Sequence, residues 1–138
     1  MITRTGNVLA SLGLAALVGG MLFFGAVTAP LVFTHLPLDL AGPFIRAVFP
    51  FYYGYMIIAA LLGLVGYWLN RELVPVLALL LVLLVTIWLW LWFIPHLDAL
   101  RVAGDSAGFN AGHRESAWIN GAQLIVALAV LIRTATRK

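Results

Sequence analysis

Residues 73–94 read LVPVLALLLVLLVTIWLWLWFI, a run without a charged side chain. An α-helix needs about 20 mainly apolar residues to cross the ~30 Å hydrocarbon core of a bilayer, so this stretch alone predicts a membrane span. Three further apolar stretches, approximately 8–33, 44–69 and 116–132, meet the same criterion. The sequence therefore predicts an all-α, polytopic membrane protein, a four-transmembrane-helix bundle that forms a single domain over residues 1–138.

The composition excludes several other classes of protein. Hydrophobic residues make up 64% of the chain and charged residues 9%, which leaves no separate soluble domain. Without cysteine the chain has no disulfides, no thiolate metal ligands and no thiol catalysis. No run of basic residues is present, so nucleic acid is not indicated as a partner. The first apolar stretch is longer than the ~7–15-residue core of a signal peptide, so we expect it to remain as an uncleaved helix.

The distribution of basic residues predicts the orientation. Cytoplasmic flanks of membrane helices carry the excess of Lys and Arg. We expect both termini in the cytoplasm, the connections 34–43 and 95–115 outside, and a location in the inner membrane of a bacterium. Five basic residues flank the surface with the termini and three flank the other: Arg4, Arg71, Arg133, Arg137 and Lys138 against Arg46, Arg101 and Arg114.

Small residues predict where the helices pack. Helices in a membrane associate through close backbone contact at Gly and Ala, because lipid tails are as apolar as leucine. The third stretch has no such pair, and its Trp88, Trp90 and Trp92 suit a lipid-facing position with indoles at the interface. Residues 104–112, with three glycines, are expected to form the one flexible loop. The predicted packing glycines are Gly20, Gly25, Gly63 and Gly121.

A polar stripe descends into the fourth span. At 100° per residue, His113, Ser116, Asn120 and Gln123 share one face of a helix. Such side chains usually hydrogen-bond to a neighbouring helix, for ~0.6–2 kcal/mol, and this structural role is one interpretation. The other is a ligand pocket, with His113 and Ser116 at its mouth and Asn120 at its floor. Four more residues predicted at the same level complete the candidate site: Arg101, His96, Asp98 and Tyr52.

The three histidines leave a metal site open as an alternative. His35, His96 and His113 all map to the predicted outer side, where carboxylates are also present. Imidazoles with carboxylates can bind zinc, copper or a haem iron. Their spacing matches no metal motif, however, so no cofactor is strongly indicated and the metal remains unknown.

Several segments resemble a known membrane family. Residues 31–37 (LVFTHLP) and 48–53 (VFPFYY) are similar to the end of the first helix and the start of the second in the transmembrane protein 205-like family, also called domain of unknown function 4149. Residues 94–101, and His113, Ser116 and Asn120 in the pattern His-x-x-Ser-x-x-x-Asn, resemble its third connection and its last helix. The resemblance implies four membrane helices with a polar signature at the start of the fourth.

The resemblance implies no reaction, because no enzymatic activity is established for that family. Its human member is associated with tolerance to platinum drugs. Here the connection between helices three and four is much shorter than in the human protein, and cysteine is absent. Sulfur ligands for platinum are therefore limited to the thioethers of Met1, Met21 and Met56.

Three functional hypotheses follow from the sequence. The first is a non-enzymatic membrane protein that binds or passes a small solute at the outer polar site. The second is an accessory or structural subunit of a larger membrane complex, in which the polar stripe serves packing. The third is a haem- or metal-binding redox protein. Beyond the lipid bilayer, we expect a second copy of the chain or other subunits as partners, since a bundle this small has much lateral surface.

Overall fold

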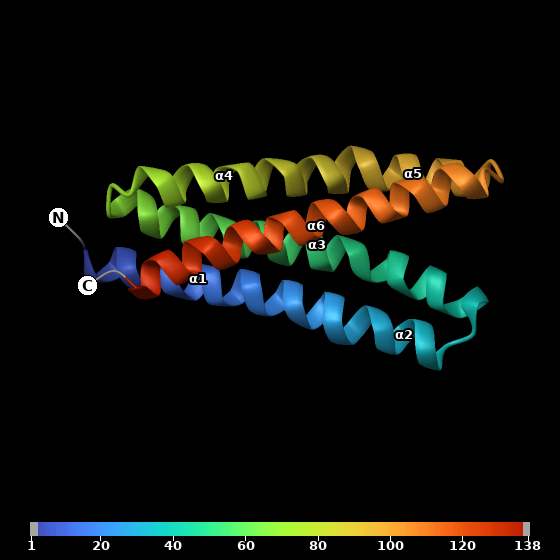
Figure 1. Ribbon diagram of the computed structural model, residues 1–138, viewed down its shortest axis with the longest axis horizontal. Coiled ribbons are helices and arrows are strands. Elements are labelled where there is room, and N and C mark those ends of the chain that lie inside the picture. Colours follow the sequence, from blue (N-terminus) through green and yellow to red (C-terminus); the bar gives the residue numbers. More distant parts are fainter. Residues whose placement is uncertain (1–2, 137–138) are drawn as a thin grey trace.

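The computed structural model describes residues 3–136, and it consists of four long helical rods (Figure 1). All four are long and apolar enough to cross a membrane, which confirms the predicted fold class. The N- and C-termini lie at one end of the bundle, called here the terminal end, and the opposite end is called the far end. The rods are α1 (Arg4–Phe23), η1 (Phe24–Thr28) and α2 (Ala29–His35); α3 (Leu38–Leu69); α4 (Leu73–Trp88), η2 (Leu89–Phe93) and α5 (Ile94–Val102); and α6 (Ser106–Thr136).

The rods extend beyond the predicted spans, and this corrects the expected flexible loop at 104–112. Only residues 103–105 connect α5 to α6, with Gly104 at φ +77° in the turn. The Asp105 carboxylate accepts the Gly108 backbone N–H at 2.9 Å, which caps the first turn of α6. Gly112 is helical and faces α5, where a Cβ would meet the Leu97 side chain. These glycines therefore serve a helix start and a close contact instead of a loop.

Two prolines explain the wide π-helical turns of the far half. The Ala29 N–H bonds to the Phe24 carbonyl and the Ile94 N–H to the Leu89 carbonyl, each five residues back. Proline follows directly in both rods, at Pro30 and Pro95. A proline ring lacks the N–H and displaces the carbonyl four residues earlier, so the preceding turn widens. The far half is accordingly less regular than the terminal half, as the prolines predict.

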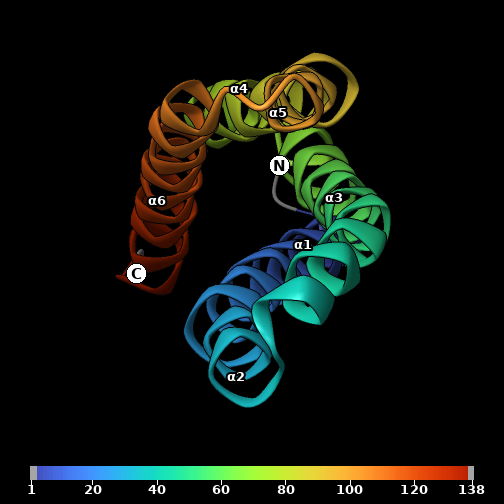
Figure 2. The ribbon, with the colours of Figure 1, turned by 90° about the vertical axis from the view of Figure 1, so that its right-hand side faces the viewer.

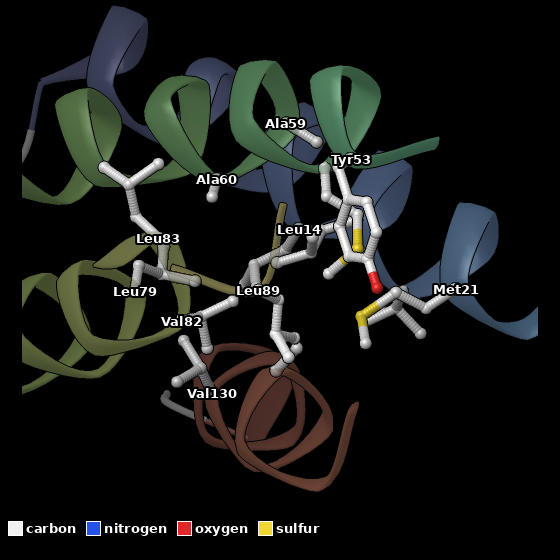
Figure 3. Close-up of a cluster of buried hydrophobic side chains, with 14 of the residues drawn as sticks. Leu14, Met21, Tyr53, Ala59, Ala60, Leu79, Val82, Leu83, Leu89 and Val130 are labelled. Atoms are coloured by element: carbon white, nitrogen blue, oxygen red, sulfur yellow. The ribbon is translucent and has the colours of Figure 1, made fainter. Parts of the chain in front are cut away.

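The third rod lies in the core, which corrects its predicted lipid-facing position. In its most apolar window 39% of residues are buried, against 22% for the fourth rod. Leu79, Val82 and Leu89 are at most 1% exposed and meet side chains from the other rods (Figure 3). Trp88 and Trp92 do remain exposed, on the opposite face. The stretch is apolar on every side, so its sequence does not distinguish the face that packs from the face that meets lipid.

Close backbone contacts join α1 to α3 in the terminal half. A Cβ added at Gly13 would overlap the Gly63 backbone, and one added at Gly66 would overlap the Ala10 backbone. Gly20 is covered by the Tyr55 ring, whose hydroxyl donates to the Ala16 carbonyl at 2.8 Å. Such contacts require residues without side chains.

Two of the four predicted packing glycines, Gly25 and Gly121, do not pack against another helix of the described chain. Neither has an atom of a neighbouring element within 4 Å of the position that a Cβ would occupy. Their prediction as contacts between helices of this chain is therefore wrong. Gly25 lies in η1, at the widened turn before Pro30, and Gly121 faces the same region from α6, where the two rods have separated.

Hydrogen bonds tie the rods together at the terminal end. Asn70 is 6% exposed, donates to Asn7 Oδ1 at 2.8 Å and accepts the Thr3 backbone N–H at 2.8 Å. The Tyr67 hydroxyl and Thr134 Oγ1 are 2.5 Å apart, linking α3 to the end of α6. This set of contacts, here called the terminal clasp, joins three of the rods.

Viewed from the far end, the bundle is an open horseshoe (Figure 2). Around it the order is α2, α3, α4 with α5, and then α6. Toward the terminal end α6 contacts α1, so the horseshoe is closed there. Toward the far end α2 and α6 stand apart.

Candidate functional site

Two adjoining cavities occupy the far half of the bundle. The first, here called the vestibule, has a volume of about 560 Å³ and lies among the first half of α3, α5 and the start of α6. The second, here called the deep cavity, has a volume of about 520 Å³ and lies among η1, α2, the middle of α3, and α6. They share part of their lining: Phe33, Ile45, Phe49, His113 and Ser116. Each volume is typical of a small-molecule site, and the shared lining makes the two cavities adjacent.

The deep cavity lies where the horseshoe is open. Its walls include Pro30 and Phe33 from one arm and Ala117 and Leu124 from the other. At this end no described helix lies between α2 and α6 (Figure 2). If the rods span a bilayer, this side of the cavity faces lipid.

Polar atoms from α6 reach the deep cavity. Ser116 is 7% exposed, and its hydroxyl donates to the His113 carbonyl at 2.8 Å. The Asn120 amide donates to the Ser116 carbonyl at 2.9 Å. Asn120 Oδ1 is buried and has no hydrogen-bond partner of normal geometry, although its side chain lies near that of Tyr53. Protein atoms cover this oxygen, so the cavity itself presents the Asn120 side chain only as part of its lining.

Aromatic rings make up the wall opposite α6. Tyr52 stacks on Phe24 with ring centres 4.1 Å apart, and this contact bridges η1 and α3. Tyr53 is 1% exposed and lies 5.3 Å from Tyr52 and 5.8 Å from Phe49, measured between ring centres. The deep cavity is therefore mostly apolar with few polar groups, a composition typical of sites for amphipathic molecules.

Charged groups gather at the vestibule. Arg101 donates to Asp98 Oδ1 through Nη2 at 2.9 Å and Nε at 3.1 Å, so the two form a local ion pair. Arg46 also approaches Asp98 Oδ1, but its Nε is 3.8 Å away, beyond hydrogen-bond distance. Two guanidinium groups thus share one carboxylate oxygen. An exposed pair of this kind contributes only ~0–1 kcal/mol to stability.

Gln123 belongs to the helix packing and does not line either cavity. It is 4% exposed and turns toward α4, where its amide donates to the Val82 carbonyl at 3.0 Å and to Thr86 Oγ1 at 2.9 Å. The four residues of the polar stripe therefore have two different surroundings. Its first three members face the cavities, and its fourth makes the hydrogen bond across helices that the structural interpretation predicts.

The three histidines lie in different surroundings. His35 contacts Thr34 Oγ1 at 2.9 Å, His96 stacks on Trp92, and His113 stacks on Phe109. Within residues 3–136, no group of three or more His, Asp or Glu side chains is arranged to hold a metal ion. His113 alone borders the cavities, whereas His96 lies outside them.

The sequence-based site omits one face of α3. Asp39 and Arg46 line the vestibule, and Phe49 lines both cavities. Separations of seven and three residues place them on one face of a helix. The predicted span began only at residue 44, whereas α3 begins at Leu38 and continues through Pro43 and Pro50. A helix extended to residue 38 would have revealed this face.

Comparison with known proteins gives one match. The family model described as Domain of unknown function (DUF4149) matches residues 12–106, which include α5 and the connection to α6. His113, Ser116 and Asn120 lie beyond the matched region. No curated protein and no solved structure matches the sequence.

Proposed function

The chain belongs to the DUF4149 family, and from this premise we propose that it is a non-enzymatic protein that binds or passes a small solute through the vestibule and the deep cavity. The family description gives no activity, so the proposal rests on the cavities themselves. Within the family we assign the chain to the transmembrane protein 205-like group. This assignment is supported by the residues 31–37, 48–53 and 113–120 described above.

One observation carries the proposal. The deep cavity is large enough for a small molecule, and its mostly apolar lining includes the polar side chains of His113, Ser116 and Asn120. In a membrane, water is scarce and an unsatisfied polar atom is costly. A bound molecule that fills the apolar volume and pairs with polar groups at its border would stabilise the site.

The distribution of Lys and Arg supports an orientation with the far end outside. The terminal end carries the larger number of basic residues, which favours the cytoplasm. The cavities would then open toward the external half of the membrane. We propose the bacterial inner membrane as the location.

A role as a subunit of an assembly is the second candidate. Gly121 is followed along α6 by exposed apolar residues such as Ile125 and Ile132, which are 68% and 61% exposed, and no atom of another described element lies within 4 Å of the position of a Gly121 Cβ. A small residue beside apolar ones suits a contact with another helix. The size of the protein in mild detergent tests this role: a single copy of the chain alone would count against it.

Filling the deep cavity tests the proposed function. Ala117 lines this cavity, so Ala117→Trp should displace a bound molecule, whereas the exposed Ala129 on the same helix offers the control Ala129→Trp. Native mass spectrometry of the purified protein in mild detergent would detect co-purifying molecules. We expect them on the parent and on Ala129→Trp but not on Ala117→Trp, at similar melting temperatures. Equal retention by both variants would overturn the proposal.

A further inference from the structure

We propose that the ligand is an anionic amphiphile, a lipid-like molecule with a phosphodiester head, which enters from the membrane between α2 and α6. The inference rests on the proposed function and specifies its ligand class. Its head would lie in the vestibule beside Arg46, and its apolar part would lie in the deep cavity.

The open side of the horseshoe supports entry from the membrane. The arms α2 and α6 separate only toward the far end, and the deep cavity lies between them. Pro30, Phe33 and Leu124 line this route with apolar surface. A hydrophilic solute would have to leave water to pass such walls, whereas the apolar part of a lipid already resides at this depth.

The guanidinium of Arg46 supports an anionic head. Its side chain is one-third exposed, lines the vestibule, and makes no hydrogen bond within the described chain. Within the described residues, the carboxylate within 4 Å of Arg46 is that of Asp98, whose same oxygen already accepts two bonds from Arg101. Arg46 therefore keeps its planar set of N–H donors free, and this geometry matches two oxygens of a phosphate.

The remaining charges of the vestibule agree with this choice. Asp98 and Arg101 neutralise one another at 2.9 Å. Asp39 lies in the first turn of α3, where the positive end of the helix dipole favours its negative charge. The vestibule lining has two carboxylates and two guanidiniums, and Arg46 is the guanidinium that is not held in a hydrogen-bonded ion pair.

The two cavities are adjacent, so one molecule can extend from one to the other. Phe49, His113 and Ser116 lie in the lining of each, which places the head site directly beside the apolar site. A head beside Arg46 and a chain beside Tyr52 and Leu124 therefore belong to one amphiphile.

Competition between lipids on the full chain tests the inference. The protein in mild detergent is titrated with phosphatidylglycerol or phosphatidylcholine, and the bound fraction is read by native mass spectrometry. We expect the parent to prefer phosphatidylglycerol, and Arg46→Gln to weaken that binding by about tenfold or more, since charge-assisted bonds to phosphate are lost. Arg46→Lys should retain part of the preference.

Arg114 offers the matched control. It is an exposed arginine on α6 that lines a shallow surface groove with Trp118 and neither cavity. Arg114→Gln removes the same charge from the same end of the bundle, so we expect phosphatidylglycerol binding unchanged. If Arg46→Gln and Arg114→Gln lose phosphatidylglycerol binding equally, the binding depends on general surface charge. That result would overturn the inference.

The remaining outcomes separate this inference from the proposed function. If Ala117→Trp abolishes binding but both lipids bind the parent equally, the cavity function stands and the anionic head is wrong. If Ala117→Trp changes nothing, the proposed function fails as well. Displacement of the lipid by inorganic phosphate at equal concentration would identify a soluble anion as the ligand instead. A preference for phosphatidylethanolamine that is lost in Asp39→Asn would replace the anionic head with a zwitterionic one.

Discussion

The terminal half and the far half of the same four rods are built in opposite ways. In the terminal half, backbones touch at Gly13 and Gly66, and the terminal clasp around Asn70 joins the rods. In the far half, the rods widen at π turns before Pro30 and Pro95 and enclose two cavities. The comparison indicates how a small bundle can contain an open site. Contacts in the terminal half hold the helices together, so the helices of the far half can stand apart around the cavities.

The energetic reason lies in what holds membrane helices together. Close contact and hydrogen bonds drive their association, since lipid competes equally for apolar surface. Both are concentrated in the terminal half, where α1 also contacts α6. At the far end the arms α2 and α6 lack such contacts, and their separation leaves the deep cavity beside Gly25 and Gly121. Three substitutions, taken from the largest expected effect to the smallest, test this division.

Gly13→Leu should have the largest effect, on folding itself. A side chain at this position would overlap the backbone of Gly63, so α1 and α3 would have to move apart. Overpacking a tight contact costs about 1–3 kcal/mol, and more when backbone must shift. Gly19→Leu is the control, because Gly19 is exposed and has no atom within 4 Å of a Cβ. Thermal unfolding in detergent should show a large loss for Gly13→Leu alone; equal melting curves would contradict the division.

Removal of the terminal clasp should have a moderate effect on stability and little on the site. Asn70→Ala leaves Thr3 and Asn7 without their partner, at about 1–3 kcal/mol for unsatisfied buried groups. The control Ser11→Ala removes an exposed polar group from α1, away from both cavities. We expect a lower melting temperature for Asn70→Ala, with the amount of bound molecule per folded protein unchanged. Loss of the bound molecule in step with stability would show that the two halves are coupled.

The sequence was sufficient for the number of spans and for the level of the site, because both depend on local features. Apolar length identified all four rods, and the helical spacing of His113, Ser116 and Asn120 placed them on one face. The orientation of a uniformly apolar helix depends on its neighbours instead. That is why the core position of α4 and the open surroundings of Gly25 were not predicted.

Arg46 shows the same limit within the site. In the sequence it is a flanking charge; in the structure it shares the vestibule with Asp98, fifty-two positions away along the chain. No local pattern connects them, since the contact depends on α3 beginning at Leu38 and on α5 continuing the third rod. Long-range pairing of this kind follows from packing, which the sequence alone does not specify.

His113→Ala should have the smallest effect on stability and a clear effect on the site. The imidazole is exposed, it stacks on Phe109 of its own helix, and it lines both cavities. Its loss should change the melting temperature little, because exposed positions usually contribute within ±0.5 kcal/mol. We expect weaker retention of the bound molecule in native mass spectrometry. His96→Ala is the control, since His96 is an exposed histidine at the same end that stacks on Trp92 and lines neither cavity. If His113→Ala retains the bound molecule as the parent does, the site is confined to Asn120 and the aromatic wall. If His113→Ala is less stable but each folded molecule still retains its ligand, the first turns of α6 have a packing role.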